Sequence, residues 1–412
     1  MTERNQSERV IINRFAGIER LELEVKPFTV LIGPNSVGKS LVAKVLFTLK
    51  SIPKELVWLA EQEADGEGDL QRSLASYAYE YLGAAGKAAI QYDSVENLSI
   101  SLAAEPSDLW AVHLPPEVQK PYRDVVGLLS NGPGAGLGEP SEESLGMAIR
   151  RLSRCIPSLP SGSQFIPAAR AVYSLIEQNA ATFFKSESFD PFVSRFGFAL
   201  GLLKKRPKLP RPNSFEALEA AHLVRAILDG DYVRENHEDA IVTRDGRRVA
   251  ARFWSSGQQE AHPLSLYLER CCEGRVRADT LFIEEPEAHL FPESQRLMTE
   301  LISLAFRASR GETRMFITSH SPYLLTALNN LLLAGQLYQE PGVDRGRLAS
   351  FVPEDRALDP KDVGVFYMDR SGCRSIIDEE TGLIQADAID QTSDTIADQF
   401  NDLLSLLPAA VI

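Results

Sequence analysis

Gly33-Pro34-Asn35-Ser36-Val37-Gly38-Lys39-Ser40 follows a strand-like apolar run at 28–32 and leads into a helix-like run at 41–46. The stretch fits the pattern G-x-x-x-x-G-K-S between a strand and a helix, which is typical of a phosphate-binding loop. In such a loop, backbone N–H groups at the positive end of the helix hold the phosphates of a nucleotide. We therefore expect the chain to bind a nucleoside triphosphate.

Individual positions of this loop have distinct roles in that chemistry. Lys39 is expected to reach the β- and γ-phosphates, and the Ser40 hydroxyl is expected to coordinate Mg²⁺. The alternative is an ordinary glycine turn before a helix, which the flanking strand and helix signals make weak. The other positions expected to cradle the nucleotide are Gly33, Pro34, Asn35, Ser36, Val37 and Gly38.

Composition limits the class of protein. The chain has 412 residues, of which 44% are hydrophobic, enough for two or three domains or for one core with a large insertion. A net charge of −14 argues against a nucleic-acid footprint over the whole chain, although a local basic face fits within it. No apolar run approaches the ~20 residues that span a bilayer, and the polar start has no signal-peptide pattern. We expect a reduced, cytoplasmic protein that does not contact a membrane.

The cysteines and the basic segment have modest interpretations. None of the four cysteines shows metal-ligand spacing, and the adjacent Cys271 and Cys272 are expected to be buried small apolar residues. The stretch Lys204–Arg211 is basic and broken by prolines. It is expected to be a solvated linker, with contact to nucleic acid or to an acidic partner as the alternative.

Periodicity and turn signals predict the order of the elements. We expect short strands first, a mainly helical segment with Gly/Pro-rich interruptions next, and a hairpin with further strands after it. In sequence order the expected elements are strands at 9–12 and 21–25, helices within 52–160, a strand end at 165–170, helices at 171–185 and 214–229, and a hairpin of 239–243 with 249–253.

A second strand-like run, 278–283, ends in the carboxylates Glu284 and Glu285. Parallel sheets place ligands at the carboxyl ends of their strands, which is where Mg²⁺ and the attacking water need acids. We expect Glu284 to hold the metal and Glu285 to polarise the water as general base. The alternative is the acid-rich start of a helix, with Pro286 and Glu287 in its first turn.

Two further polar positions point to the same chemistry. The strand-like run 314–319 ends at His320, before a helix that Ser321 and Pro322 are suited to begin. From the ligand edge of the sheet, His320 can sense the γ-phosphate. Ser256 and Gly257 open another helix and form a second anion-binding end, whose alternative is a simple serine cap. Because the first loop already holds the phosphates, this second end is expected to face another subunit.

These pieces in this order resemble the head of ATP-binding-cassette ATPases of the non-transporter branch. That branch includes structural-maintenance-of-chromosomes heads, recombination-repair ATPases and the overcoming-lysogenisation-defect family with its phage-defence relatives. The resemblance covers about the first 50 residues and roughly 240–330. It implies that Gly33–Ser40 is the Walker A loop, Glu284 and Glu285 the Walker B pair, Ser255–Gln259 the signature, Glu287–His289 the D-loop region and His320 the switch histidine.

Three positions depart from that family's pattern. Glu284 stands where aspartate is usual, and Gln258 stands where a second signature glycine is usual. No clear Q-loop glutamine is present, and Gln164 is the candidate. After His320 we expect a short finish with strands at 363–368 and 374–377 and a helix at 397–406. Its acids, Asp378–Glu380, are expected to be solvated turn residues rather than a nuclease centre.

The expected fold is an α/β P-loop ATPase head, a mixed sheet flanked by helices, with a large and mainly helical insertion. We expect an N-terminal lobe at 1–51, the insertion at 52–238 and a C-terminal lobe at 239–412. The resemblance implies an ATP- and Mg²⁺-dependent switch whose heads dimerise, or form higher homo-oligomers, around ATP. It would control a separate effector, and the resemblance implies a role in anti-phage defence. The alternatives are a DNA recombination or repair ATPase that binds nucleic acid, and a nucleotide-sensing scaffold with negligible turnover.

Overall fold

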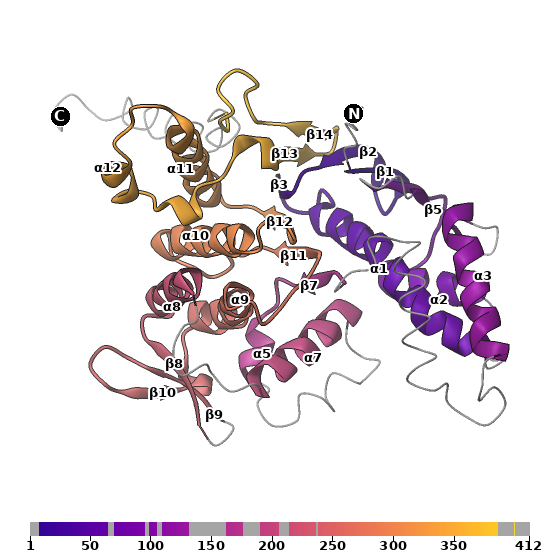
Figure 1. Ribbon diagram of the computed structural model, residues 1–412, viewed down its shortest axis with the longest axis horizontal. Coiled ribbons are helices and arrows are strands. Elements are labelled where there is room, and N and C mark those ends of the chain that lie inside the picture. Colours follow the sequence, from indigo (N-terminus) through magenta and orange to yellow (C-terminus); the bar gives the residue numbers. More distant parts are fainter. Residues whose placement is uncertain are drawn as a thin grey trace.

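The structure has a central six-stranded sheet, and the sequence motifs follow the ends of its strands (Figure 1). The computed structural model describes residues 8–64, 70–94, 99–104, 109–131, 162–175, 190–205, 214–235, 238–385 and 399. All neighbouring strands of this sheet are parallel except the edge pair β13 and β14. The strand order is β14 (Gly372–Ser375), β13 (Val363–Asp369), β3 (Phe28–Ile32), β12 (Arg314–Ser319), β11 (Thr280–Glu284) and β7 (Gln164–Ile166).

The two faces of the central sheet belong to separate hydrophobic cores, because side chains alternate along each strand. On one face Phe165, Phe282 and Phe316 pack against α1 (Lys39–Ala64). On the other face Ile166 and Ile283 join the core that also includes the helices after the hairpin. Those helices are α9 (Ser256–Cys272), α10 (Pro292–Ala308) and α11 (Pro322–Gln339). The mixed sheet flanked by helices confirms the expected fold class.

A second, antiparallel sheet lies beside α1 and begins with the two predicted N-terminal strands. Its order is β2 (Ile18–Val25), β1 (Glu8–Phe15), β4 (Ala89–Asp93), β5 (Ser99–Ala104) and β6 (Trp110–His113). The last three strands fall in the segment expected to be mainly helical, so that expectation is wrong for residues 89–93, 99–104 and 110–113. Alternating burial explains the strands, since Ile90 and Tyr92 are buried between exposed neighbours. Two helices, α2 (Leu70–Leu82) and α3 (Pro116–Asn131), complete this region.

The rest of the expected insertion joins the body that holds α9. It contains α5 (Ala171–Leu175), α7 (Pro191–Lys205), α8 (Phe215–Leu228) and β8 (Asp231–Glu235). Strand β8 forms a three-stranded sheet, in the order β10 (Arg248–Ala250), β9 (Glu238–Val242) and β8, with strands from the expected C-terminal lobe. The predicted hairpin is present as β9 and β10. Helix α1 continues past residue 51 and β8 begins before residue 239. Neither expected boundary, after residue 51 or after residue 238, coincides with a break between elements, and the three-part division of the chain remains a proposal.

The basic segment and the C-terminal part differ partly from expectation. Lys204 is not a solvated linker residue, because its ammonium lies 2.5 Å from the buried Asp239 carboxylate. Residues 206–211 lie outside the described residues, as does the helix predicted at 397–406 apart from residue 399. Three short elements precede β13, namely α12 (Arg345–Ala349) and the 3₁₀ turns η2 (Glu354–Arg356) and η3 (Pro360–Asp362). A further 3₁₀ turn, η1 (Ala251–Phe253), lies between β10 and α9.

The turn acids after β14 form local structure. The Asp378 carboxylate accepts hydrogen bonds from the backbone N–H groups of Glu380 and Thr381, at 3.1 and 2.8 Å. These bonds, together with those from the Thr381 hydroxyl, lower the pKa of Asp378. Among the residues that the structure describes, no group of three or more His, Cys, Asp or Glu side chains is arranged to hold a metal. Likewise, no helix in the described ranges is both long and apolar enough to cross a membrane.

Candidate phosphate-binding site

The loop between β3 and α1 has the backbone that its glycines predict. Gly33 has φ +154°, and a Cβ atom there would lie 1.9 Å from the Met368 carbonyl oxygen at the end of β13. Gly38 has φ +106° and Ser36 has φ +63°, both in the left-handed region. The loop is thus held between α1 and β13 in a conformation that only glycine permits at position 33.

The Lys39 ammonium lies at the centre of the loop. It donates to the carbonyl oxygens of Gly33 and Pro34 at 2.8 and 2.7 Å, and it lies 3.2 Å from Nδ1 of His320. Burial lowers the pKa of Lys39 from 10.5 to about 8, against the opposing attraction of Glu285 and Glu287. Phosphate oxygens would replace these partners and favour the charged amine.

His320 connects the loop to the end of β11. Its Nδ1 lies 3.2 Å from the Lys39 ammonium, and its Nε2 lies 3.3 Å from a carboxylate oxygen of Glu285. A charged Lys39 can only donate to Nδ1, which leaves Nε2 as the ring nitrogen that can donate to Glu285. The backbone N–H of His320 donates to Glu287 at 2.7 Å, and the Ser319 hydroxyl donates to the same oxygen at 2.8 Å. Glu287, placed in the D-loop region by resemblance, therefore fixes the end of β12 within its own chain.

Glu284 and Ser40 fit a magnesium site. Glu284 is 6% exposed and burial raises the pKa of its carboxyl, against the opposing influence of the Ser40 hydroxyl and then Lys44. One carboxylate oxygen accepts from the Ala168 N–H at 3.3 Å, whereas Oε1 is buried without a hydrogen-bond partner. A buried acceptor without a donor beside a hydroxyl suits an Mg²⁺ ion, which takes few protein ligands and keeps phosphate and water oxygens.

Most of the predicted residues come together around one cavity of about 550 Å³. Part of the phosphate loop, Glu285 and His320 meet there because β3, β11 and β12 are parallel and end at the same edge of the sheet. The predicted residues Gly33, Pro34, Val37 and Glu284 are not among the residues that line this cavity. Its lining residues are Asn35, Ser36, Gly38, Lys39, Ser40, Leu41, Glu285 and His320.

Ser256 and Gly257 do not line this cavity. They begin α9, where Ser256 is exposed and a Cβ at Gly257 would lie 2.9 Å from the His289 carbonyl oxygen. Ser255 is the cap of the helix, and the Gln258 side chain accepts from the Ser255 N–H at 3.0 Å, completing a capping box. Gln258 at the second signature position therefore serves the helix end itself, and the exposed Ser256 is left free to meet another molecule.

The sequence pattern misplaced one residue and missed another. Gln164 lies at the amino end of β7, paired with Leu281, so it is at the wrong edge of the sheet for a nucleotide contact. Its amide instead donates to the Phe165 carbonyl at 2.8 Å. Arg170, four residues after β7 ends at the correct edge, is fully buried and donates hydrogen bonds to the backbone carbonyls of both Glu284 and Glu285. The signal in the sequence that could have indicated Arg170 as a site residue is its charge, because it closely follows the apolar strand end at 165–166.

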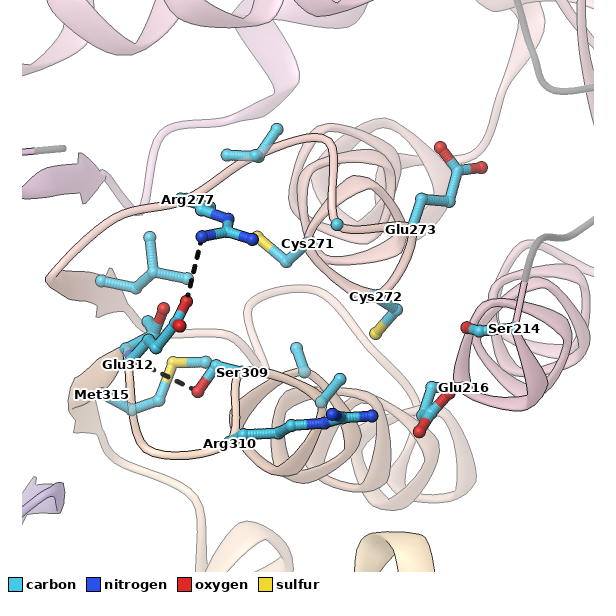
Figure 2. Close-up of a pocket in the computed structure, with 16 residues that line it drawn as sticks. Ser214, Glu216, Cys271, Cys272, Glu273, Arg277, Ser309, Arg310, Glu312 and Met315 are labelled. Atoms are coloured by element: carbon cyan, nitrogen blue, oxygen red, sulfur yellow. Dashed lines mark hydrogen bonds and ion pairs between the residues drawn. The ribbon is translucent and has the colours of Figure 1, made fainter.

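Another hollow, of about 330 Å³, lies at the opposite edge of the central sheet (Figure 2). Leu281 and Met315, near the amino ends of β11 and β12, line it together with Cys271 and Cys272. Burial raises the pKa of Cys271 to about 12 and that of Cys272 still further, so both thiols stay protonated at neutral pH. Cys272 is buried, as expected from the sequence, whereas Cys271 is only partly buried.

Part of the chain matches the model of an ATPase family. Residues 205–325 match the family model described as the AAA ATPase domain. This range holds the α9 start, Glu284, Glu285 and His320 but not the phosphate loop, whose assignment rests on its sequence and geometry. A search of curated proteins gave no match.

Solved structures that match this chain include three SMC head domains. The SMC head of Thermotoga maritima is 12% identical, with 78% of this chain and 92% of that chain covered and a TM-score of 0.37. An SMC head bound to the C-terminal domain of ScpA, from Pyrococcus furiosus, is 8% identical, with 95% and 98% covered and a TM-score of 0.40. An SMC head bound to the C-winged helix domain of ScpA is 9% identical, with 89% and 96% covered and a TM-score of 0.43.

Proposed function

We propose that this protein binds and hydrolyses ATP and acts as a conformational switch that dimerises head-to-head around the nucleotide. The observation that carries the proposal is the line of contacts from Lys39 through His320 to Glu285 beside the phosphate loop. It joins a phosphate-binding cation to a carboxylate suited to polarise water. The ATPase-domain match over 205–325 supports the same chemistry.

The residues of this site divide the work of hydrolysis. In the structure the donors of Lys39 point to Gly33, Pro34 and His320, so bound β- and γ-phosphates would compete for them. Glu285 would then orient the attacking water as general base, and His320 would remain beside it as the sensor of the γ-phosphate. Ser40 and Glu284 would hold Mg²⁺, which neutralises charge on the phosphates when bound.

Dimerisation is proposed because the second anion-binding end, at the start of α9, does not line the cavity of the phosphate loop. Ser256 lies outside the cavity that the phosphate loop lines, at the exposed start of α9. Two strongly exposed aromatic residues flank it, Phe253 at 70% and Phe291 at 78% exposure. The His289 carbonyl packs on Gly257, so the loops that hold these rings lie together. Such a face suits a second copy of the chain that closes the ATP site.

The output of the switch is proposed to be a separate effector in anti-phage defence. The support is the family resemblance that the sequence motifs carry. The alternative of a DNA-directed ATPase has less support, since Lys204 of the basic stretch pairs with buried Asp239. The effector model would be favoured if a protein encoded by an adjacent gene co-purified with this chain only when ATP is present.

The experiment that tests the ATPase proposal compares Lys39→Ala with Glu285→Gln. The first removes the cation beside the phosphates and should abolish ATP binding in calorimetry. The second keeps the phosphate and metal contacts, so ATP should bind as in wild type while turnover falls by about a hundredfold or more. Unchanged affinity in Lys39→Ala, or unchanged turnover in Glu285→Gln, would remove the respective residue from its role.

A further inference from the structure

Arg170 is a buried arginine whose guanidinium contacts two separate functional elements. It is fully buried, directly before α5, in a position where a charge is costly unless every donor is satisfied. Its donors meet backbone carbonyl oxygens of Pro167, Glu284, Glu285 and Glu260, at 3.1, 2.6, 2.8 and 3.1 Å. One rigid planar group therefore spans the end of β11 and the first turns of α9.

On one side Arg170 holds the turn that carries the proposed general base. Glu285 has φ +41°, a left-handed conformation that costs of order 1–3 kcal/mol for a residue with a side chain. Its N–H donates to the Thr318 carbonyl at 2.9 Å, and its own carbonyl accepts from Arg170 and from the Ala288 N–H. Arg170 is the side chain that fixes this carbonyl, and with it the direction in which the Glu285 carboxylate leaves the backbone.

On the other side Arg170 is attached to the beginning of α9. Besides the bond from Nε to the Glu260 carbonyl, the Arg170 backbone N–H donates to the Glu260 carboxylate at 3.0 Å, and Nε lies 3.6 Å from the same oxygen. The Ser174 hydroxyl of α5 adds a bond to the Gln259 carbonyl at 3.0 Å. Glu260 is one helical turn after Ser256, so these bonds reach the part of α9 that would meet a second head.

We infer that Arg170 is a positioning residue that couples the start of α9 to the backbone of Glu285 within one head. The inference rests on the proposed function, since it assigns to Arg170 control over the proposed base. When a partner engages Ser256 and shifts the first turn of α9, the guanidinium carries that shift to the Glu285 carbonyl. The carboxylate then changes its position relative to His320. Docking of the second head and the orientation of the base are linked through this one side chain.

The test replaces Arg170 by lysine, which keeps the charge beside Glu260 but cannot bridge both elements. A misplaced base can cost roughly 10- to 100-fold in rate. We expect kcat to fall by that factor, while the Kd for ATP stays within about threefold because the phosphate loop is untouched. Arg356→Met is the matched control, since Arg356 is also largely buried and lies 2.6 Å from both Glu219 and Glu300, away from the site. It should lower the melting temperature and leave kcat unchanged.

A double-mutant cycle separates positioning from general stability. If Arg170 acts through Glu285, adding Arg170→Lys to Glu285→Gln should cause no further loss of kcat. Losses that multiply, or an unchanged kcat in Arg170→Lys alone, would overturn the inference. Failure of the proposed ATPase function would instead appear in the wild-type protein, as absent turnover.

A readout independent of turnover decides the inference in that event. Hydrogen exchange in Arg170→Lys should become faster at the amides of Glu285 and Ala288, whose bonds hold the turn, and stay unchanged over 33–40. Unchanged exchange at both amides would refute the coupling whether or not the protein hydrolyses ATP.

Discussion

Truncation of Phe47 to alanine tests whether α1 is fastened to the central sheet by aromatic packing. Phe47 is fully buried two turns after Ser40, with its ring 5.3–5.9 Å from the rings of Tyr81, Phe165, Phe192 and Phe282. Phe→Ala in a core costs about 3–5 kcal/mol, and because four rings surround Phe47 we place this site at the upper end of that range, near 5 kcal/mol. With an unfolding entropy of about 2.1 cal/mol/K per residue, a chain of 412 residues should lose roughly 5–6 °C in melting temperature.

The assay measures thermal unfolding by differential scanning calorimetry, and Phe198→Ala is the control. Phe198 lies on α7 and is 54% exposed, so its truncation should shift the transition by less than about 1 °C. Phe47→Leu should fall between the two because most of the buried volume is kept. A shift for Phe47→Ala no larger than that of Phe198→Ala would refute the packing argument.

Three further outcomes follow from the site. Because burial holds the pKa of Lys39 at about 8 and phosphates favour its charged form, ATP binding should take up a proton above that pH and be about tenfold weaker at pH 9 than at pH 7. Calorimetry in buffers of different ionisation heat measures this uptake, and none at pH 9 would contradict the argument. Gly33→Ala would place Cβ 1.9 Å from the Met368 carbonyl and should weaken ATP binding about tenfold or more in the same assay, whereas Gly246→Ala, with open space around it, should not. An equal mixture of Ser256→Arg and Lys39→Ala proteins should recover about a quarter of wild-type ATPase activity, since half of random dimers contain one intact site of two; no recovery despite heterodimers in native mass spectrometry would speak against a site shared between heads.

The sequence predicted the parts of the site that lie on chain segments with strong local signals. The phosphate loop, the acids after β11 and the histidine after β12 each follow a buried strand, and parallel strands bring such ends to one edge. Local pattern therefore located Lys39, Glu285 and His320 without knowledge of the tertiary fold.

Features that depend on distant partners were not predictable in this way. Arg170 acquires its role only when β7 lies beside β11, and a short strand such as β7 has too few residues to specify that neighbour. The strands β4, β5 and β6 are short and half exposed, so their period-two signal is weak against the helical pattern around them. Gln164 looked suitable by residue type, but type does not say at which edge of the sheet a side chain lies.

The strand order of the central sheet has a consequence for biosynthesis. β3 is flanked by β12 and β13, whose pairing residues are made roughly 290 and 335 residues after it. While the ribosome is still extending the chain, the strand at 28–32 has neither neighbouring strand. The phosphate loop then also lacks its contact with Met368 of β13. At about 5–20 residues per second, this interval lasts tens of seconds. Until residue 367 has left the ribosome, the nascent head therefore exposes an unpaired, largely apolar strand, and we expect its yield in cells to depend on chaperone capacity.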